Sequence, residues 1–133
     1  MDKHRILVVE DEESLLKLET ILFSSKGYDV AGVMDGKSAL MEIISFKPDL
    51  VVLDLMLPEM DGFEVCRQIK ENPETGHIPV IMLTARKNGR EFARGREAGA
   101  DAYITKPFKA AKVIEVIERL LSAGERAVCE YVF

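Results

Sequence analysis

The sequence predicts an α/β fold in which helices cover both faces of a single parallel sheet. Short runs of apolar and β-branched residues alternate with amphipathic stretches along the chain, as in repeated βαβ units. Residues 50–53 are apolar at every position, which is typical of a strand buried on both faces of a parallel sheet. Prolines and glycines fall between these segments. Together these observations favour a doubly wound sheet.

Five apolar runs are the predicted strands, and they lie at residues 5–10, 28–33, 50–54, 80–84 and 102–105. Apolar side chains at helical spacing predict helices before the second and third strands and after the fifth. The residues with this spacing are Leu15, Leu18, Leu22, Leu40, Ile43, Ile44, Val113, Ile114, Ile117, Leu120 and Leu121. Gly27 follows the first helix as its predicted C-terminal cap.

The helix predicted at residues 88–98 differs from the others because it has few side chains to bury. Its arginines are Arg90, Arg94 and Arg96. A helix with little buried apolar surface is expected to shift more easily than its neighbours. The simpler interpretation is that its charges form a solvated face.

Length and charge limit the class of protein. A chain of 133 residues is expected to form one domain with a sufficient core. Its net charge is -5, whereas nucleic-acid binders usually carry a basic surface, so no direct nucleic-acid contact is expected. Cys66 and Cys129 suggest no disulfide framework. No segment is long enough to span a bilayer, so we expect a cytoplasmic protein without membrane insertion.

Acidic residues follow the first and third predicted strands where each one ends. Because parallel strands end at the same edge and lie about 4.8 Å apart, Glu10, Asp11 and Asp54 are expected to meet. The alternative for residues 11–13 is a set of helix-capping acids. Three close carboxylates repel one another, which either raises the pKa of one acid or favours a hard cation. An oxygen-only cluster suits hydrated Mg²⁺.

The remaining strand ends supply groups that a phosphoryl anion needs. Thr84 offers a hydroxyl, Ala85 a backbone amide and Lys106 an ammonium. With these groups around it, Asp54 is a candidate nucleophile that would form an acyl phosphate. Taken singly, Thr84 is an ordinary strand residue and Lys106 an ordinary loop cation. Their joint placement favours the phosphoryl site.

Four segments resemble the receiver domains of bacterial two-component response regulators. They are ILVVEDE at 6–12, DLVVLDLMLPEMDG at 49–62, PVIMLTA at 79–85 and GADAYITKPF at 99–108. The resemblance implies a flavodoxin-like five-stranded parallel sheet with strand order 2-1-3-4-5 and five helices. It covers a receiver domain at residues 4–124. Residues 125–133 form a short C-terminal tail that would pack on the body, add a strand or meet a partner.

The resemblance also implies a role for each site residue. Asp54 is the expected phosphoacceptor, and Glu10, Asp11, Asp54 and the Met56 carbonyl are the expected Mg²⁺ ligands. Lys106 is expected to contact the phosphoryl group.

Two further features follow from the family. Thr84 and Tyr103 are the expected switch residues, and Lys106-Pro107 is an expected cis peptide. Where many members carry Asp at the first acidic position, this chain has Glu10, which keeps the charge. Ala102 replaces the second acid that winged-helix members usually show before the switch aromatic.

The implied function is a signalling switch charged at Asp54 by a sensor histidine kinase, a phosphotransfer protein or a small acyl phosphate. Phosphorylation would alter the surface of the fourth helix, fifth strand and fifth helix, with Arg90 and Arg94 on that face. The target would be a separate protein or an output domain that this chain lacks, and a homodimer is an open alternative. Beyond phosphoryl transfer at Asp54, no enzymatic turnover is expected.

Other functions fit parts of the pattern. Aspartyl phosphohydrolases and related metal-dependent enzymes usually need an Asp-x-Asp pair, but Met56 occupies the second position. A flavodoxin-like electron carrier would bind phosphate after the first strand, where residues 10–13 are acidic. A degenerate receiver acting as an unphosphorylated interaction module is the third alternative, although every chemical position is filled.

Overall fold

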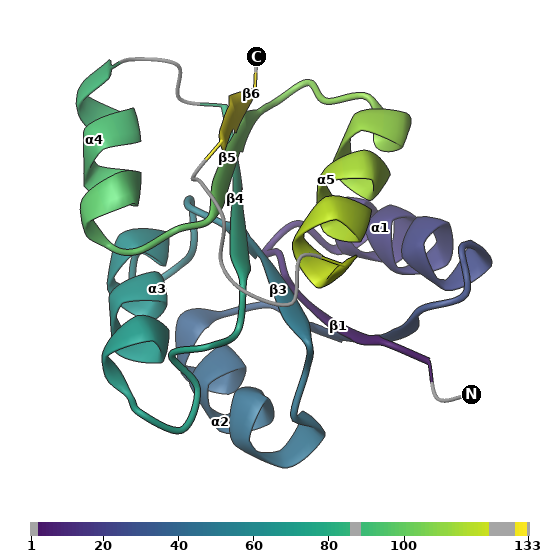
Figure 1. Ribbon diagram of the computed structural model, residues 1–133, viewed down its shortest axis with the longest axis horizontal. Coiled ribbons are helices and arrows are strands. Elements are labelled where there is room, and N and C mark those ends of the chain that lie inside the picture. The colour runs from purple at the N-terminus through teal and green to yellow at the C-terminus, as the bar shows by residue number, and fades with distance from the viewer. Residues whose placement is uncertain (1–2, 86–88, 123–129, 133) are drawn as a thin grey trace.

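The computed structural model describes residues 3–85, 89–122 and 130–132. One parallel sheet runs through the centre of the molecule in the order β2-β1-β3-β4-β5-β6 (Figure 1). The strands are β1 Arg5–Val9, β2 Asp29–Val33, β3 Leu50–Asp54, β4 Val80–Thr84, β5 Ala102–Thr105 and β6 Glu130–Val132. The helices are α1 Glu13–Ser25, α2 Gly36–Phe46, α3 Gly62–Glu71, α4 Gly89–Glu97 and α5 Ala110–Ser122.

The five expected strands and their 2-1-3-4-5 order are confirmed. The sheet gains a sixth strand, however, because the C-terminal segment pairs in parallel with β5, with Tyr103 opposite Tyr131. An edge strand presents unpaired backbone groups that accept a further strand. Of the alternatives for the tail, its described part therefore adds a strand.

Helices cover both faces of the sheet (Figure 1), with α2, α3 and α4 on one side and α1 and α5 on the other. Successive β1 residues divide between the two faces: Leu7 joins the core under α2 to α4, and Val8 joins the core under α1 and α5. This division explains the continuous apolar strands, since β3 and β4 are buried at every position by helices on both faces.

Two helices each expose one side chain that the apolar spacing predicts to be buried. Leu18 is 60% exposed in α1, where Glu19 and Phe23 are buried instead. Ile44 is 50% exposed in α2, where Ile43 is buried as predicted. Residues one position apart point about 100° apart around a helix, so a small error of phase exposes a side chain at the border of the predicted stripe.

Helix ends agree with the sequence. Gly27 has a φ of 95° just past α1, which is the left-handed conformation that glycine tolerates at a helix end. Helix α4 begins at Gly89, and the predicted start at Asn88 lies outside the described residues. Within the described ranges, no helix has the length and apolar character needed to cross a membrane.

Candidate functional site

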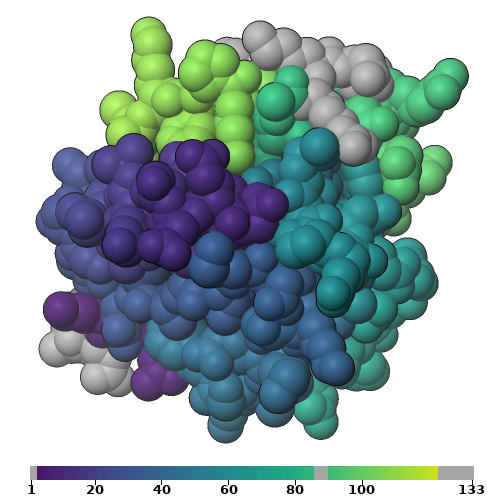
Figure 2. All heavy atoms as spheres, turned by 180° about the vertical axis from the view of Figure 1, so that it is seen from behind, coloured from purple at the N-terminus to yellow at the C-terminus, as the bar shows by residue number. Residues whose placement is uncertain are grey.

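Three carboxylates meet at the edge of the sheet where β1 and β3 end. Glu10 directly follows β1, Asp11 is next, and Asp54 is the last residue of β3. One oxygen from each lies within 4.8 Å of the others. Glu10 and Asp54 are buried, whereas Asp11 is exposed to solvent. The purple and teal surfaces in Figure 2 show early residues lying beside the middle of the chain at this edge.

The loop after Asp54 folds back on the end of its strand. The Met56 N–H donates to Asp54 Oδ1 at 3.0 Å, and the Gly62 N–H donates to the Leu55 carbonyl at 3.1 Å. A Cβ at Gly62 would lie 2.7 Å from the Leu55 Cα and 2.8 Å from the Asp54 carbonyl oxygen. Only glycine permits so close an approach, so this packing fixes the loop that follows the acid.

Lys106 brings a positive charge to the carboxylates. Its Nζ lies 3.2 Å from Glu10 Oε1 and 3.3 Å from Asp54 Oδ2. Partial burial opposes the ammonium charge, but attraction to Asp54 and Glu10 outweighs it and raises the pKa of Lys106. The Lys106-Pro107 peptide is cis, and the Lys106 N–H donates to the Thr84 carbonyl. Lys106 thus connects the end of β5 to the acids at β1 and β3.

The charges of this cluster suit a cation. Burial, then hydrogen bonding to Asp54 and repulsion from it, raise the pKa of Glu10 to about 8. Three carboxyl groups face the single ammonium of Lys106. Carboxylate oxygens at this spacing are the donor set of a hard divalent ion, so the residues present fit Mg²⁺.

The remaining predicted residues lie on β4 and β5. Thr84 is the buried last residue of β4, beside the Asp54–Leu83 register pair, and Ala85 is exposed just after it. Tyr103 is fully buried, and its ring meets the Phe92 ring edge-on at a centroid distance of 4.7 Å. A Cβ at Gly95 would lie 2.9 Å from the Tyr103 ring. Tyr103 therefore packs directly under α4.

Glu19 is a buried acid that the sequence pattern does not indicate. It is 1% exposed on the inner side of α1, and its Oε2 has no hydrogen-bond partner in the described part of the chain. Burial chiefly raises the pKa of Glu19 to about 7; Lys106 lowers it and Asp54 raises it. Sequence reasoning could identify this buried carboxyl group only if it were known which side of α1 faces the sheet.

The Glu19→Leu variant is expected to be more stable than the wild type, and the difference should widen between pH 4.5 and pH 7. The folded state favours the neutral acid, because the pKa rises from 4.5 to about 7 on folding. The raised pKa therefore stabilises the folded wild type fully below pH 4.5, and this stabilisation is lost as the pH rises and Glu19 ionises. At pH 8 the gain should be about 1–3 kcal/mol. Urea unfolding at several pH values measures it.

The exposed Glu13 on the same helix provides the control: its side chain is 71% exposed, so Glu13→Leu should change stability only slightly. A stability difference for Glu19→Leu that stays constant from pH 4.5 to pH 8 would contradict the raised pKa.

Comparisons with known proteins point to a single family. Residues 6–118 match the model of the response regulator receiver domain. The DNA-binding response regulator MtrA of Mycolicibacterium smegmatis is 40% identical over 123 residues, which cover 92% of this chain and 53% of that protein. The chain thus spans about half the length of the curated relatives it matches.

Solved structures show the same fold. The signal receiver domain of a signal transduction histidine kinase from Syntrophus aciditrophicus has a TM-score of 0.86 and 36% identity, covering 93% of this chain and 94% of that chain. The chemotaxis response regulator CheY4 of Vibrio cholerae has a TM-score of 0.84 and 25% identity, covering 90% of this chain and 100% of that chain. The chain therefore belongs to the receiver domain family of two-component response regulators.

Proposed function

We propose that this chain is a phosphoacceptor switch and that Asp54 receives the phosphoryl group. The observation that carries the proposal is the placement of Asp54, which ends a buried strand among two further acids and the ammonium of Lys106. A sensor histidine kinase, a phosphotransfer protein or a small acyl phosphate would be the donor.

The transfer needs a nucleophile and groups that accept charge. An Asp54 carboxylate oxygen attacks phosphorus, and the bond from phosphorus to the donor's nitrogen or oxygen breaks as the acyl phosphate forms. A carboxylate already holds the attacking electron pair, so no general base is required. Lys106, which now pairs with Asp54, would pair with the new phosphoryl oxygens. The Thr84 hydroxyl and Ala85 N–H would complete the anion site.

The acids have a second role beside the nucleophile. Glu10, Asp11, Asp54 and the Met56 carbonyl would hold Mg²⁺, which when bound neutralises charge on the transferring oxygens. The exposure of Asp11 leaves this side of the cluster open to solvent. Loss of the phosphoryl group by hydrolysis would be the only other chemistry at Asp54.

The output of such a switch is altered binding. Phosphorylation would bias an equilibrium between two arrangements of α4, β5 and α5, with Thr84 and Tyr103 as the residues that respond. The relative MtrA is a DNA-binding regulator. The absence of direct nucleic-acid contact, expected from the acidic charge, therefore stays a prediction for this chain. A protein target or output domain would read the altered surface.

Millimolar Mg²⁺ is expected to raise the melting temperature of the wild type by roughly 3–5 °C, because a ligand of the folded state stabilises that state by mass action. Asp11→Asn should abolish most of the rise, since it removes one of the three carboxylates. Differential scanning fluorimetry with and without MgCl₂ measures the shift. Asp29→Asn changes an acid at the start of β2, remote from the cluster, and should keep the wild-type response. Equal shifts in the Asp11 and Asp29 variants would argue against the site.

A further inference from the structure

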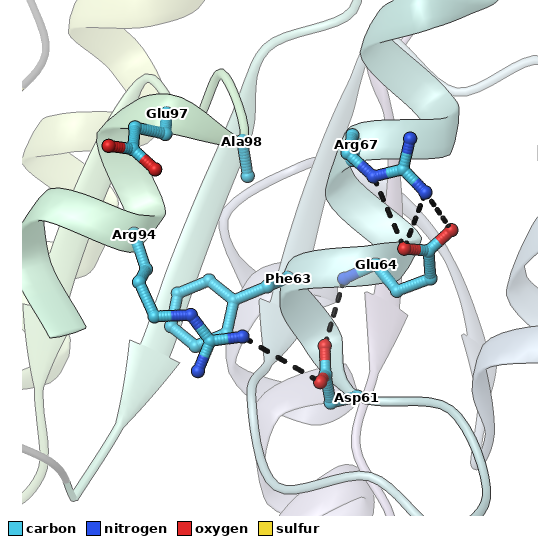
Figure 3. Close-up of a pocket in the computed structure, with 7 residues that line it drawn as sticks. All are labelled: Asp61, Phe63, Glu64, Arg67, Arg94, Glu97 and Ala98. Carbon is cyan, nitrogen blue, oxygen red and sulfur yellow. Dashed lines mark hydrogen bonds and ion pairs between the residues drawn. The ribbon is translucent and has the colours of Figure 1, made fainter.

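A groove of about 330 Å³ lies between α3 and α4, outside the phosphoryl site. Arg94 reaches into it from α4, and Asp61 and Phe63 face it from the start of α3 (Figure 3). Sequence reasoning placed Arg94 on the surface formed by α4, β5 and α5, and that expectation is wrong. Arg94 points toward α3 instead, because the start of α3 offers it both an anion and an aromatic ring.

Arg94 makes two different contacts across the groove. Its Nη2 lies 3.9 Å from Asp61 Oδ2, and its guanidinium carbon lies 4.1 Å from the centre of the Phe63 ring. The ion pair is about half exposed and would be weak alone. Stacking on the aromatic face adds a cation–π attraction and also holds the flat guanidinium in place.

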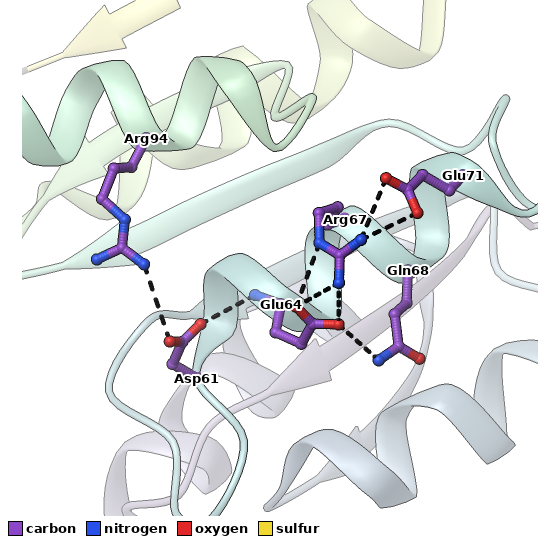
Figure 4. A network of polar contacts seen from close by, with 6 residues as sticks. All are labelled: Asp61, Glu64, Arg67, Gln68, Glu71 and Arg94. Carbon is purple, nitrogen blue, oxygen red and sulfur yellow. Dashed lines mark hydrogen bonds and ion pairs between the residues drawn. The ribbon is translucent and has the colours of Figure 1, made fainter.

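Asp61 is held firmly enough to act as an anchor. Its Oδ1 accepts the Glu64 N–H at 2.9 Å as the N-terminal cap of α3, which leaves Oδ2 for Arg94. Arg67 bonds both Glu64 and Glu71, so ion pairs reinforce the same helix face (Figure 4). One carboxylate thus serves the helix cap and the neighbouring helix at once.

The same contact joins the phosphoryl site to α4. Asp61 closes the loop that begins after Asp54 and that packs against the strand end through Gly62. The other side of α4 contacts Tyr103 through Phe92 and Gly95. A displacement of the loop would therefore reach the helix that covers Tyr103.

We propose that Arg94, Asp61 and Phe63 form a latch that holds α4 against α3 in the unphosphorylated protein and opposes phosphorylation at Asp54. The second part rests on the proposed function. Only a contact that differs between two states can shift their populations, and the latch supplies such a difference between the resting arrangement and one with α4 displaced. Opening it removes a contact that favours the resting form.

Hydrogen exchange tests the latch without any phosphoryl donor. Arg94→Met keeps the length of the side chain and removes its charge, whereas Asp61→Asn removes the anion and keeps a good helix cap. Each variant should raise the amide exchange rates of α4 roughly threefold to tenfold. In the double variant, the increase in the amide exchange rate should be smaller than the product of the two single increases, because both changes break the same contact. Arg90→Met, an exposed change on the same helix, should leave the rates unchanged.

Phosphorylation tests the coupling. With acetyl phosphate and Mg²⁺, Arg94→Met should gain the phosphoryl mass roughly threefold to tenfold faster than the wild type. Unchanged exchange in α4, or independent effects of the two single changes, would overturn the latch. Faster exchange with an unchanged phosphorylation rate would overturn its link to Asp54. If the wild type gains no phosphoryl mass, both the proposed function and the link between the latch and Asp54 are overturned. The hydrogen-exchange result would still test the latch by itself.

Discussion

Asp54→Asn protein should gain no phosphoryl mass when it is incubated with acetyl phosphate and Mg²⁺, whereas the wild type should gain one phosphoryl group. The amide has nearly the same shape and keeps an oxygen that can accept the Met56 N–H, which now bonds Asp54 Oδ1 at 3.0 Å. It lacks the anionic oxygen that attacks phosphorus, so the loss should be complete. Mass spectrometry of the intact protein measures it.

The control for this experiment is Asp35→Asn. Asp35 caps α2 through the Ser38 N–H, a role that asparagine fills equally well, and it lies outside the acidic cluster. This variant should take up label like the wild type. Label that persists in Asp54→Asn would assign the phosphoryl group to another residue.

The largest expected loss of stability comes from Lys70→Met. The Lys70 Nζ bonds Asp101 Oδ2 at 2.9 Å and the Ile78 carbonyl at 2.6 Å. The two side chains are only 9% and 1% exposed. Removing the ammonium deletes this ion pair with the buried Asp101 carboxylate, although the Val80 N–H still donates to that carboxylate at 2.8 Å. The free energy of unfolding should fall by about 3–5 kcal/mol.

Urea unfolding of the Lys70→Met protein measures the loss. Lys17→Met provides the matched control, because Lys17 pairs with Glu13 on the surface of α1 and both side chains are more than 70% exposed. That change should alter stability by no more than about 0.5 kcal/mol. If the two variants unfold at similar urea concentrations, the buried pair contributes no more than an exposed one.

The parts of the structure that sequence predicts well are those that local pattern determines. A run such as residues 50–54 is typical of a strand covered on both faces, and topology then brings Asp54 beside Glu10. The same reasoning placed Lys106 at the strand ends, where its Nζ bonds both acids.

What sequence missed depends on contacts between distant segments. Whether Leu18 or Glu19 faces the sheet depends on the phase of α1, which its packing against the strands fixes. The orientation of Arg94 depends on where α3 begins, and the sixth strand depends on the free edge of β5. In each case the contacting segments are far apart in the sequence, so no local sequence pattern predicts the contact.

The two separate cores have a consequence for engineering. Tyr103 and Phe92 belong to the core under α2, α3 and α4, whereas Val113 and Ile117 belong to the core under α1 and α5. Substitutions at the α1 side of the second core, around Phe23, should change thermal stability with little effect on the response to phosphorylation, because α1 takes no part in the rearrangement proposed for α4, β5 and α5. A designer who wants a more stable biosensor with the same signal should therefore begin under α1.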